Sequence, residues 1–359
     1  MGPLRANIAD CGRNDSQIVT LSSFFPPACP STACHLLNLR YSRRVDPTRN
    51  ATLRRNSYAL GHGALALTIL IWSGWMVQTR FLSLGKLRPI ELAALRFTFA
   101  ALVLFPILLR RGWILAAPTK AKGFVRGVIL SACSGVPYVL LVASGMEFAP
   151  AGHAATLING AMVTTTVILA VVFFREAPRP MQIMGTLSIL GGLALLLANQ
   201  KISHLGVGHL MFVLGGVLWA FYSSLLKKWG AHPLHATAIA AVYSAFIALP
   251  LYAILQPTPL KLSAREILIY GSYQGIITGA VALFLFSFGV ARLGATQASM
   301  YVPFTPVLTV ILAFLFLGET PNQVELCSMG LVVGGFIMAT WAQARARFTL
   351  AQPSKILMQ

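Results

Sequence analysis

Side chains that could bind a solute stand at matching places in the two halves of this chain. Trp72 and Trp75 lie in one apolar segment, and Trp219 and Tyr222 repeat them 147 residues later. An aromatic face offers apolar contact area, and an indole N–H or phenol O–H fixes the orientation of a ligand. The pairs therefore predict a central aromatic site for amphipathic solutes. Ordinary aromatic packing or an interfacial belt is the alternative.

Polar side chains inside apolar segments form a second group of candidates. Asn159 lies in the first half, and Gln274 and Tyr301 lie in the second. Each could hydrogen-bond a solute, and each could equally join neighbouring helices. Pro303 and Pro306 stand in the same apolar stretch as Tyr301 and predict a bending point for gating, unless neighbouring groups satisfy the freed carbonyls.

Charged side chains are few, and no Asp or Glu lies at the centre of an apolar segment. Glu91 and Arg96 open one segment, and a charge at that depth must reach the interface or find a partner. Arg96 could face substrate or, the favoured interpretation, pair with carbonyls or Glu91. Glu176 and Glu319 each close a segment, where they could act in gating or satisfy nearby backbone donors.

Catalytic and metal-binding patterns are missing from the sequence. It contains no GxSxG, no HExxH, no Asp-rich metal motif and no pair of acids inside a segment. The five cysteines have no CxxC spacing. We therefore expect no enzyme, no metal site and no cofactor.

The elements that carry these residues must be membrane helices. Hydrophobic residues make up 56% of the 359 and charged residues only 10%, against roughly 25% charged in soluble proteins. Because a bilayer core takes about 20 helical residues, continuous apolar runs predict an all-α polytopic membrane protein. The expected spans are 59–79, 89–109, 124–146, 150–174, 181–199, 206–226, 233–255, 268–291, 296–317 and 323–343.

The basic residues predict the orientation. Without the N-terminal tail, inner connections would hold 13 Lys and Arg and outer ones six if the N-terminus is cytoplasmic, so both termini are expected inside. The net charge of +19 lies in the tail and loops, as expected beside anionic lipid and not for a nucleic-acid site. The expected parts are a disordered basic tail 1–57, repeats 58–200 and 201–345, and a cytoplasmic tail 346–359.

The chain repeats itself. Glu176 and the glycine pair at 191–192 recur as Glu319 and the pair at 334–335, both after 143 residues. Each repeat holds five spans, so the second enters the membrane inverted, which predicts a substrate site near the midplane between the halves.

Short motifs resemble the EamA-type members of the drug/metabolite transporter superfamily. Residues 91–97 (ELAALRF) resemble the start of that family's second helix, and residues 316–319 (FLGE) its fourth-helix signature, with Pro306 thirteen residues before Glu319. The first half departs from the pattern, with Val163 in place of the proline and FFRE at 173–176. The resemblance covers about residues 59–343. It implies a ten-helix inner-membrane transporter, often an exporter of amino acids or related metabolites.

We therefore expect a secondary transporter of small metabolites that works by alternating access. Its partners would be a small-molecule solute and membrane lipid, and the oligomeric state stays open. A membrane scaffold or sensor that keeps the transporter fold is the main alternative.

Overall fold

A computed structural model describes residues 47–198, 206–255, 260 and 262–351, and the side chains of 47–57, 295–296 and 341–351 are not described. Contacts divide the chain into two units, residues 1–55 and 56–359. The second unit contains every membrane span. Most of the predicted tail, residues 1–46, and the last eight residues of the chain, 352–359, lie outside the described part.

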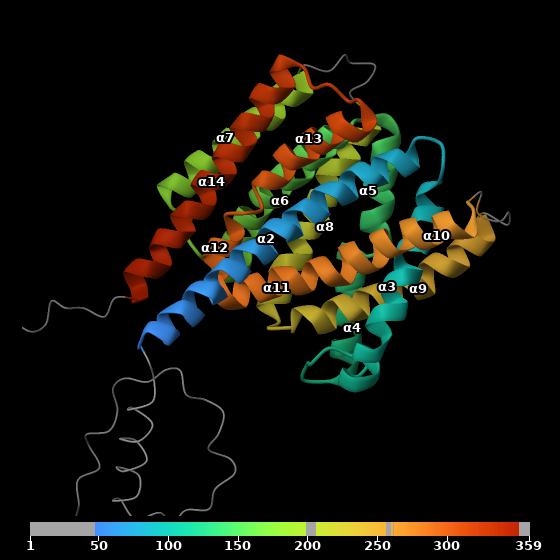
Figure 1. Cartoon of the computed structure of the whole chain (residues 1–359), viewed down its shortest axis with the longest axis horizontal. Helices are drawn as coiled ribbons and strands as arrows, with labels where there is room; N and C mark the ends of the chain where they lie inside the picture. Colours follow the sequence, from blue (N-terminus) through green and yellow to red (C-terminus); the bar gives the residue numbers. More distant parts are fainter. Residues whose placement is uncertain (1–46, 199–205, 256–259, 261, 352–359) are drawn as a thin grey trace, which may run out of the picture. The chain divides into compact units, whose positions relative to one another are not determined.

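All described secondary structure is helical, and ten segments of it are long and apolar enough to cross a membrane (Figure 1). The helices are α2 (Pro47–Ser83), α3 (Pro89–Arg111), α4 (Lys120–Ser134), α5 (Val136–Phe148), α6 (Ala151–Phe174), α7 (Pro180–Ala198), α8 (Val207–Lys228), α9 (Pro233–Leu255), α10 (Ala264–Gly271), η1 (Ser272–Val281), α11 (Ala282–Leu293), α12 (Ala295–Ser299), α13 (Phe304–Leu317) and α14 (Gln323–Ala351). This confirms the predicted fold class.

Three spans are less regular than the sequence predicted. The third span consists of α4 and α5, which are separated at Gly135. Glycine fits this position, since a Cβ there would clash with the Ser131 carbonyl and the Ser244 hydroxyl. The eighth span contains the π-helical stretch η1 between α10 and α11. The ninth is α12 and α13, separated by a turn that ends at Pro303. The first and last helices are longer than the predicted spans: α2 begins at Pro47, inside the predicted tail, and α14 continues to Ala351.

Close helix contacts repeat between the halves. A Cβ on Gly145 of α5 would lie 3.0 Å from the Gly208 carbonyl of α8. One on Gly289 of α11 would lie 3.3 Å from the Gly61 carbonyl of α2. Each contact joins the third span of one repeat to the first span of the other: α5 with α8, and α11 with α2. Small residues let backbones approach closely where the surrounding lipid offers no hydrophobic driving force.

The fifth helices of the two repeats, α7 and α14, pack side by side (Figure 1). Gly185 and Gly335 meet at their crossing, where a Cβ on either would lie 2.5 Å from the other's carbonyl oxygen. Helices α3 and α9, which are the second of each repeat, also pack together. Equivalent helices therefore pair with each other, as an inverted repeat with an approximate two-fold axis requires.

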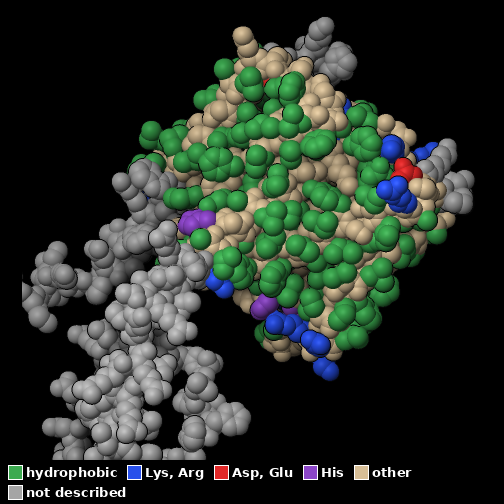
Figure 2. All heavy atoms as spheres, in the orientation of Figure 1, with side chains coloured by type: hydrophobic (Ala, Val, Ile, Leu, Met, Phe, Trp, Pro, Cys, Tyr) green, Lys and Arg blue, Asp and Glu red, His purple; other side chains and the backbone are tan. Residues whose placement is uncertain are grey.

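The surface of the second unit is strongly apolar. Hydrophobic side chains cover most of the face in Figure 2, and its charged side chains lie at the margins. Large apolar residues such as Ile254 and Phe316 are about three-quarters exposed, at 76% and 74%. A surface of this kind fits the hydrocarbon of a bilayer.

Candidate functional site

A cavity of about 160 Å³ lies among helices of both halves. We call the end of the bundle where α2 begins and α3 ends the proximal end, and the opposite end the distal end. The cavity starts near mid-depth and reaches Thr237, in the second turn of α9, toward the proximal end. Its lining includes Trp72, Trp75, Met76, Arg96, Leu104, Ser134, Tyr138, Asn159, Met162, Trp219, Tyr222, Thr237, Thr278, Leu283, Val302 and Thr305.

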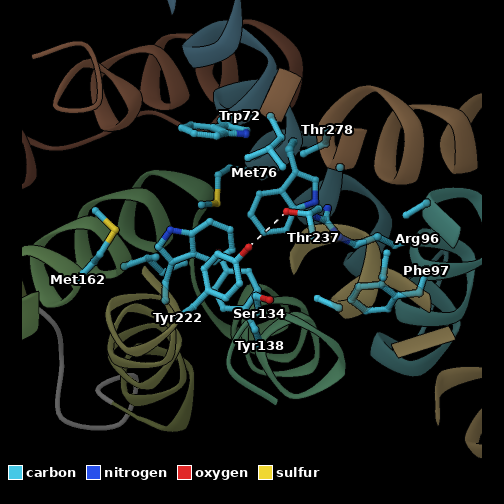
Figure 3. Close-up of a pocket in the computed structure, with 18 of the residues that line it drawn as sticks. Trp72, Met76, Arg96, Phe97, Ser134, Tyr138, Met162, Tyr222, Thr237 and Thr278 are labelled. Atoms are coloured by element: carbon cyan, nitrogen blue, oxygen red, sulfur yellow. Dashed lines mark hydrogen bonds between the residues drawn. The ribbon is translucent and has the colours of Figure 1, made fainter. Parts of the chain in front are cut away.

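Four aromatic rings form one continuous wall of this cavity. Trp75 stacks on Tyr138 with ring centroids 6.1 Å apart. Tyr138 lies 5.2 Å from Trp219, which lies 5.4 Å from Tyr222. Figure 3 shows Trp72 across the cavity from Tyr138 and Tyr222. The predicted aromatic residues of the two halves are thus brought together, and Tyr138, which sequence reasoning missed, joins them.

Gln274 supports this wall and does not border the cavity. Its Oε1 accepts a hydrogen bond of 2.7 Å from Trp75 Nε1, and its Nε2 donates to Thr79 over 3.2 Å. The Gln274 side chain is fully buried in η1. Short π-helical stretches such as η1 are frequent at functional sites.

Arg96 borders the cavity from α3. Its guanidinium carbon lies 4.8 Å from the centre of the Trp75 ring, and its Nη1 is 3.5 Å from Gln274 Oε1. Glu91 is not its partner, because the Glu91 carboxylate accepts a hydrogen bond from the Arg88 backbone N–H and caps the start of α3. No carboxylate of the described residues forms an ion pair with Arg96.

Hydroxyl and amide groups complete the lining. Tyr222 and Thr237 share a hydrogen bond of 3.3 Å (Figure 3). Asn159 borders the cavity, and its amide nitrogen donates to the Ala155 carbonyl over 2.7 Å. The buried Thr305 hydroxyl has no hydrogen-bond partner among the described residues. The Asn159 amide and the Tyr222 and Thr237 hydroxyls are polar groups of the lining that could hydrogen-bond a solute.

Two predicted regions lie outside the lining. The Tyr301 hydroxyl contacts His62 Nδ1 at 2.7 Å near the proximal end. Pro303 caps α13 and Pro306 is buried in its first turn. The carbonyl of Val302 accepts a hydrogen bond from the Thr305 N–H, so the backbone at this break is partly satisfied within the turn.

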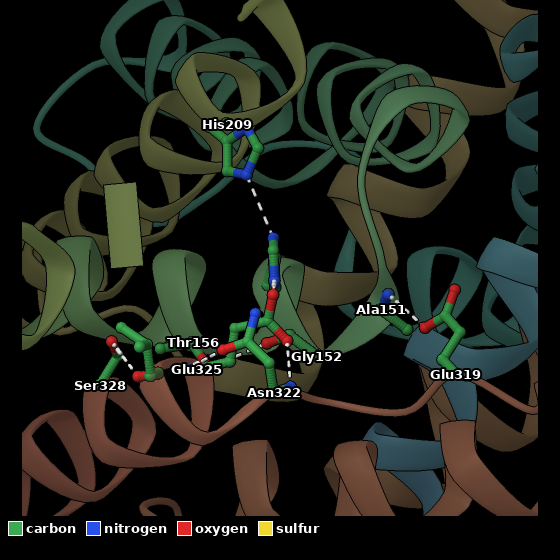
Figure 4. A network of polar contacts seen from close by, with 10 residues as sticks. Ala151, Gly152, Thr156, His209, Glu319, Asn322, Glu325 and Ser328 are labelled. Carbon is green, nitrogen blue, oxygen red and sulfur yellow. Dashed lines mark hydrogen bonds and ion pairs between the residues drawn. The ribbon is translucent and has the colours of Figure 1, made fainter. Parts of the chain in front are cut away.

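A network of polar contacts joins four helices at the distal end. Arg80 Nε, at the end of α2, donates over 2.8 Å to Glu319 Oε1, just beyond α13. Glu319 Oε2 accepts from the Ala151 N–H at the start of α6 (Figure 4). Arg80 also donates to the Met146 carbonyl at the end of α5. The Arg80 and Glu319 side chains are only 14% and 19% exposed.

A second polar chain lies beside it. His153 Nε2 is 3.1 Å from Glu325 Oε1, and His153 Nδ1 is 3.1 Å from His209 Nε2. A cavity of about 220 Å³ adjoins both networks and is lined by Arg80, His153, Glu319 and Glu325 among others. The fold thus gives His153 two ionisable neighbours, Glu325 and His209.

The predicted counterpart of Glu319 has a weaker role. Glu176 lies 3.5 Å from Lys227 Nζ at the proximal end, and both side chains are more than half exposed. The two glutamates therefore occupy corresponding positions in their repeats but make different contacts.

Some site residues gave no clear signal in the sequence. Tyr138 could have been noticed because it follows Gly135 and Pro137, which interrupt the middle of a span. Arg80 and Glu325 lie near the ends of apolar segments, where nothing in the sequence distinguishes them. Among the described residues, no group of His, Cys, Asp and Glu is arranged to hold a metal ion.

Comparisons with known proteins agree with this architecture. An uncharacterized transporter of Archaeoglobus fulgidus is 26% identical over 79% of this chain and 98% of its own length. An S-adenosylmethionine uptake transporter of Rickettsia bellii is 24% identical over 81% and 96%. A probable terminal-alkyne amino-acid exporter of Streptantibioticus cattleyicolor is 23% identical over 77% and 91%.

A solved crystal structure with 20% sequence identity covers 81% of this chain and 99% of its own, with a TM-score of 0.56, and this likeness concerns the fold alone. The EamA-like transporter family matches twice, over residues 59–198 and 206–341. The two matches coincide with the two five-helix halves, and the chain therefore belongs to the EamA-like transporter family as a ten-helix membrane transporter.

Proposed function

We propose that this protein is a secondary transporter that exports small amphipathic metabolites, amino acids or related solutes, across the inner membrane by alternating access. The observation that carries the proposal is the central cavity with its aromatic wall, lined from both halves. A site at the interface of inverted repeats can face one side or the other when the halves rock.

The two ends of the bundle support a state that is closed at the distal end. The Arg80–Glu319 contacts tie α2, α5 and α6 together there, and the cavity extends toward the proximal end instead. With the proximal end on the cytoplasmic side, as the Lys and Arg distribution favours, a solute would enter from the cytoplasm. The proposed direction is export, which is the direction in the name of one relative, the amino-acid exporter, whereas the Rickettsia bellii relative is named for uptake.

The alternative is a scaffold or sensor that keeps the fold without moving a solute. A scaffold has no need of a cavity lined from both halves by aromatic rings and polar side chains. The cavity therefore favours transport over this alternative.

The test is efflux and uptake of a labelled panel of amino acids and metabolites in proteoliposomes, with and without a pH gradient. The double variant Trp72→Ala/Trp219→Ala removes two cavity rings, and we expect it to lose saturable flux by at least about tenfold. Phe284→Ala, a ring on α11 that is 60% exposed and outside the lining, is the control. Folded wild-type protein that moves no solute of the panel, or a double variant with unchanged flux, would contradict the proposal.

A further inference from the structure

We propose that Arg96 is the carboxylate-binding point of the cavity, so that the solute is a small monocarboxylate with an apolar or aromatic body. This inference rests on the proposed function, because it assigns the solute class of the same cavity. Three observations carry it: the charge of the lining, the geometry around the guanidinium and the chemistry of the opposite wall.

The charge of the lining is not balanced. Arg96 is the one charged residue among the described residues that line the cavity, and the lining contains no Asp or Glu. Arg96 lies in the second turn of α3, inside a span. A guanidinium stays protonated in proteins, and a charge at membrane depth is costly unless a partner compensates it. A carboxylate on the solute would supply that missing partner.

The described residues make few contacts with the guanidinium: it lies over one ring and has one long hydrogen bond. Its carbon lies 4.8 Å from the centre of the Trp75 ring, and Nη1 makes one long contact of 3.5 Å with Gln274 Oε1. Trp75 is itself fixed by its 2.7 Å hydrogen bond to Gln274. Stacking uses the flat face of the group, whereas carboxylates bind to the N–H donors along its edge, often through two parallel hydrogen bonds. Arg96 is thus oriented in advance for a carboxylate.

The remainder of the cavity suits an apolar body. Tyr138, Trp219 and Tyr222 form the ring wall, and Figure 3 shows Met162 on the side of the cavity opposite Arg96 and Phe97. An ammonium group would find aromatic faces and hydroxyls but no carboxylate of the described lining. The site therefore favours a simple carboxylate over its amide, and a carboxylate over an amine.

The experiment measures binding to the full-length protein in lipid nanodiscs by isothermal titration. The probes are 3-phenylpropionate, its neutral amide 3-phenylpropanamide and the cation 3-phenylpropylamine, which share one ring and one chain length. In the wild type we expect the carboxylate to bind at least about tenfold more tightly than either analogue, because a charge-assisted hydrogen bond is stronger than a neutral one.

Two variants and a matched control test the role of Arg96. Arg96→Gln is expected to bind carboxylate and amide equally, and Arg96→Lys, which keeps a cation in α3, to lose carboxylate affinity without losing amide affinity. Arg126→Gln is the control. The Arg126 guanidinium also lies over a tryptophan, 5.3 Å from the Trp229 ring centre, but it is outside the cavity lining, so the preference should persist.

The inference is wrong if wild-type protein binds the amide as tightly as the carboxylate, or binds none of the probes. It is also wrong if Arg96→Lys, or a folded Arg96→Gln, keeps the full preference. Flux through proteoliposomes separates this outcome from the proposed function. Transport without an Arg96-dependent preference removes only the carboxylate site, and an Arg96-dependent preference without transport removes only the transport proposal.

Discussion

Arg80 and Glu319 are separated by 239 residues in the sequence and by 2.8 Å in the fold. Together with the Ala151 N–H and the Met146 carbonyl they link helices at the distal end, and both side chains are mostly buried, so little water screens their charges. The exposed pair Glu176–Lys227 at the proximal end has no such setting. A partly buried ion pair that loses one partner leaves the other charge uncompensated, whereas an exposed pair contributes little.

We therefore predict different costs for the two glutamates that the sequence presents as equivalents. Glu319→Gln should lower the free energy of unfolding by about 1–3 kcal/mol, because Arg80 loses its charged partner. Glu176→Gln should change it by less than about 0.5 kcal/mol. Thermal unfolding of both variants in the same detergent measures the difference, and equal shifts would contradict the assigned role of Glu319.

The helices of this protein are positioned by small residues whose neighbours only the packing reveals. Gly192 of α7 and Gly335 of α14 face each other's helix, and a Cβ on Gly192 would lie 2.7 Å from the Ser328 carbonyl. The adjacent glycines, Gly191 and Gly334, would meet nothing within 4 Å. Each glycine pair thus has one member that packs and one that does not.

Gly192→Ala and Gly335→Ala should each destabilise the protein by about 1–3 kcal/mol, since an added methyl group forces the packed helices apart. Gly191→Ala and Gly334→Ala are matched controls one residue away, with the same loss of backbone freedom in the unfolded chain. They should be neutral or slightly stabilising. Thermal stability of the four purified variants tests this, and a loss at Gly191 as large as that at Gly192 would refute the helix crossing.

The whole molecule consists of two inverted halves that meet at a shared cavity. Equivalent helices pair across the halves, as α7 with α14 and α3 with α9. The irregular third and eighth spans, interrupted at Gly135 and over η1, are the third helices of their repeats, and both contribute to the lining. Irregular backbone in a membrane is tolerated where it borders a cavity or packs against protein.

The orientation of the whole molecule stays a prediction, as do the limits of the four parts of the chain. We expect the connection between α8 and α9 to face the cytoplasm and the one between α9 and α10 to face outside. Green fluorescent protein fused after Trp229 should fluoresce, and alkaline phosphatase fused after Leu260 should be active, because each reporter works on one side only. The reverse pattern would invert the topology and with it the proposed direction of export.

The sequence by itself determined the ten helices and their duplication. Backbone groups in lipid must bond within their own segment, so long apolar runs permit only helices, and a 143-residue offset with five spans per copy requires inversion. The aromatic candidates were also readable, since Trp72, Trp75, Trp219 and Tyr222 recur at one spacing and all border the cavity.

Only the tertiary structure decided which faces of those helices meet. In the fold, Tyr138 lies between Trp75 and Trp219, and Gln274 hydrogen-bonds Trp75 from outside the cavity. Arg96 borders the cavity, whereas Tyr301 is not part of its lining. The physical reason is that a span in lipid is apolar on every side, so hydrophobic periodicity carries little information about its rotation. Contacts between such helices depend on close backbone approach and on side chains far apart in the sequence, which are defined once the helices have packed.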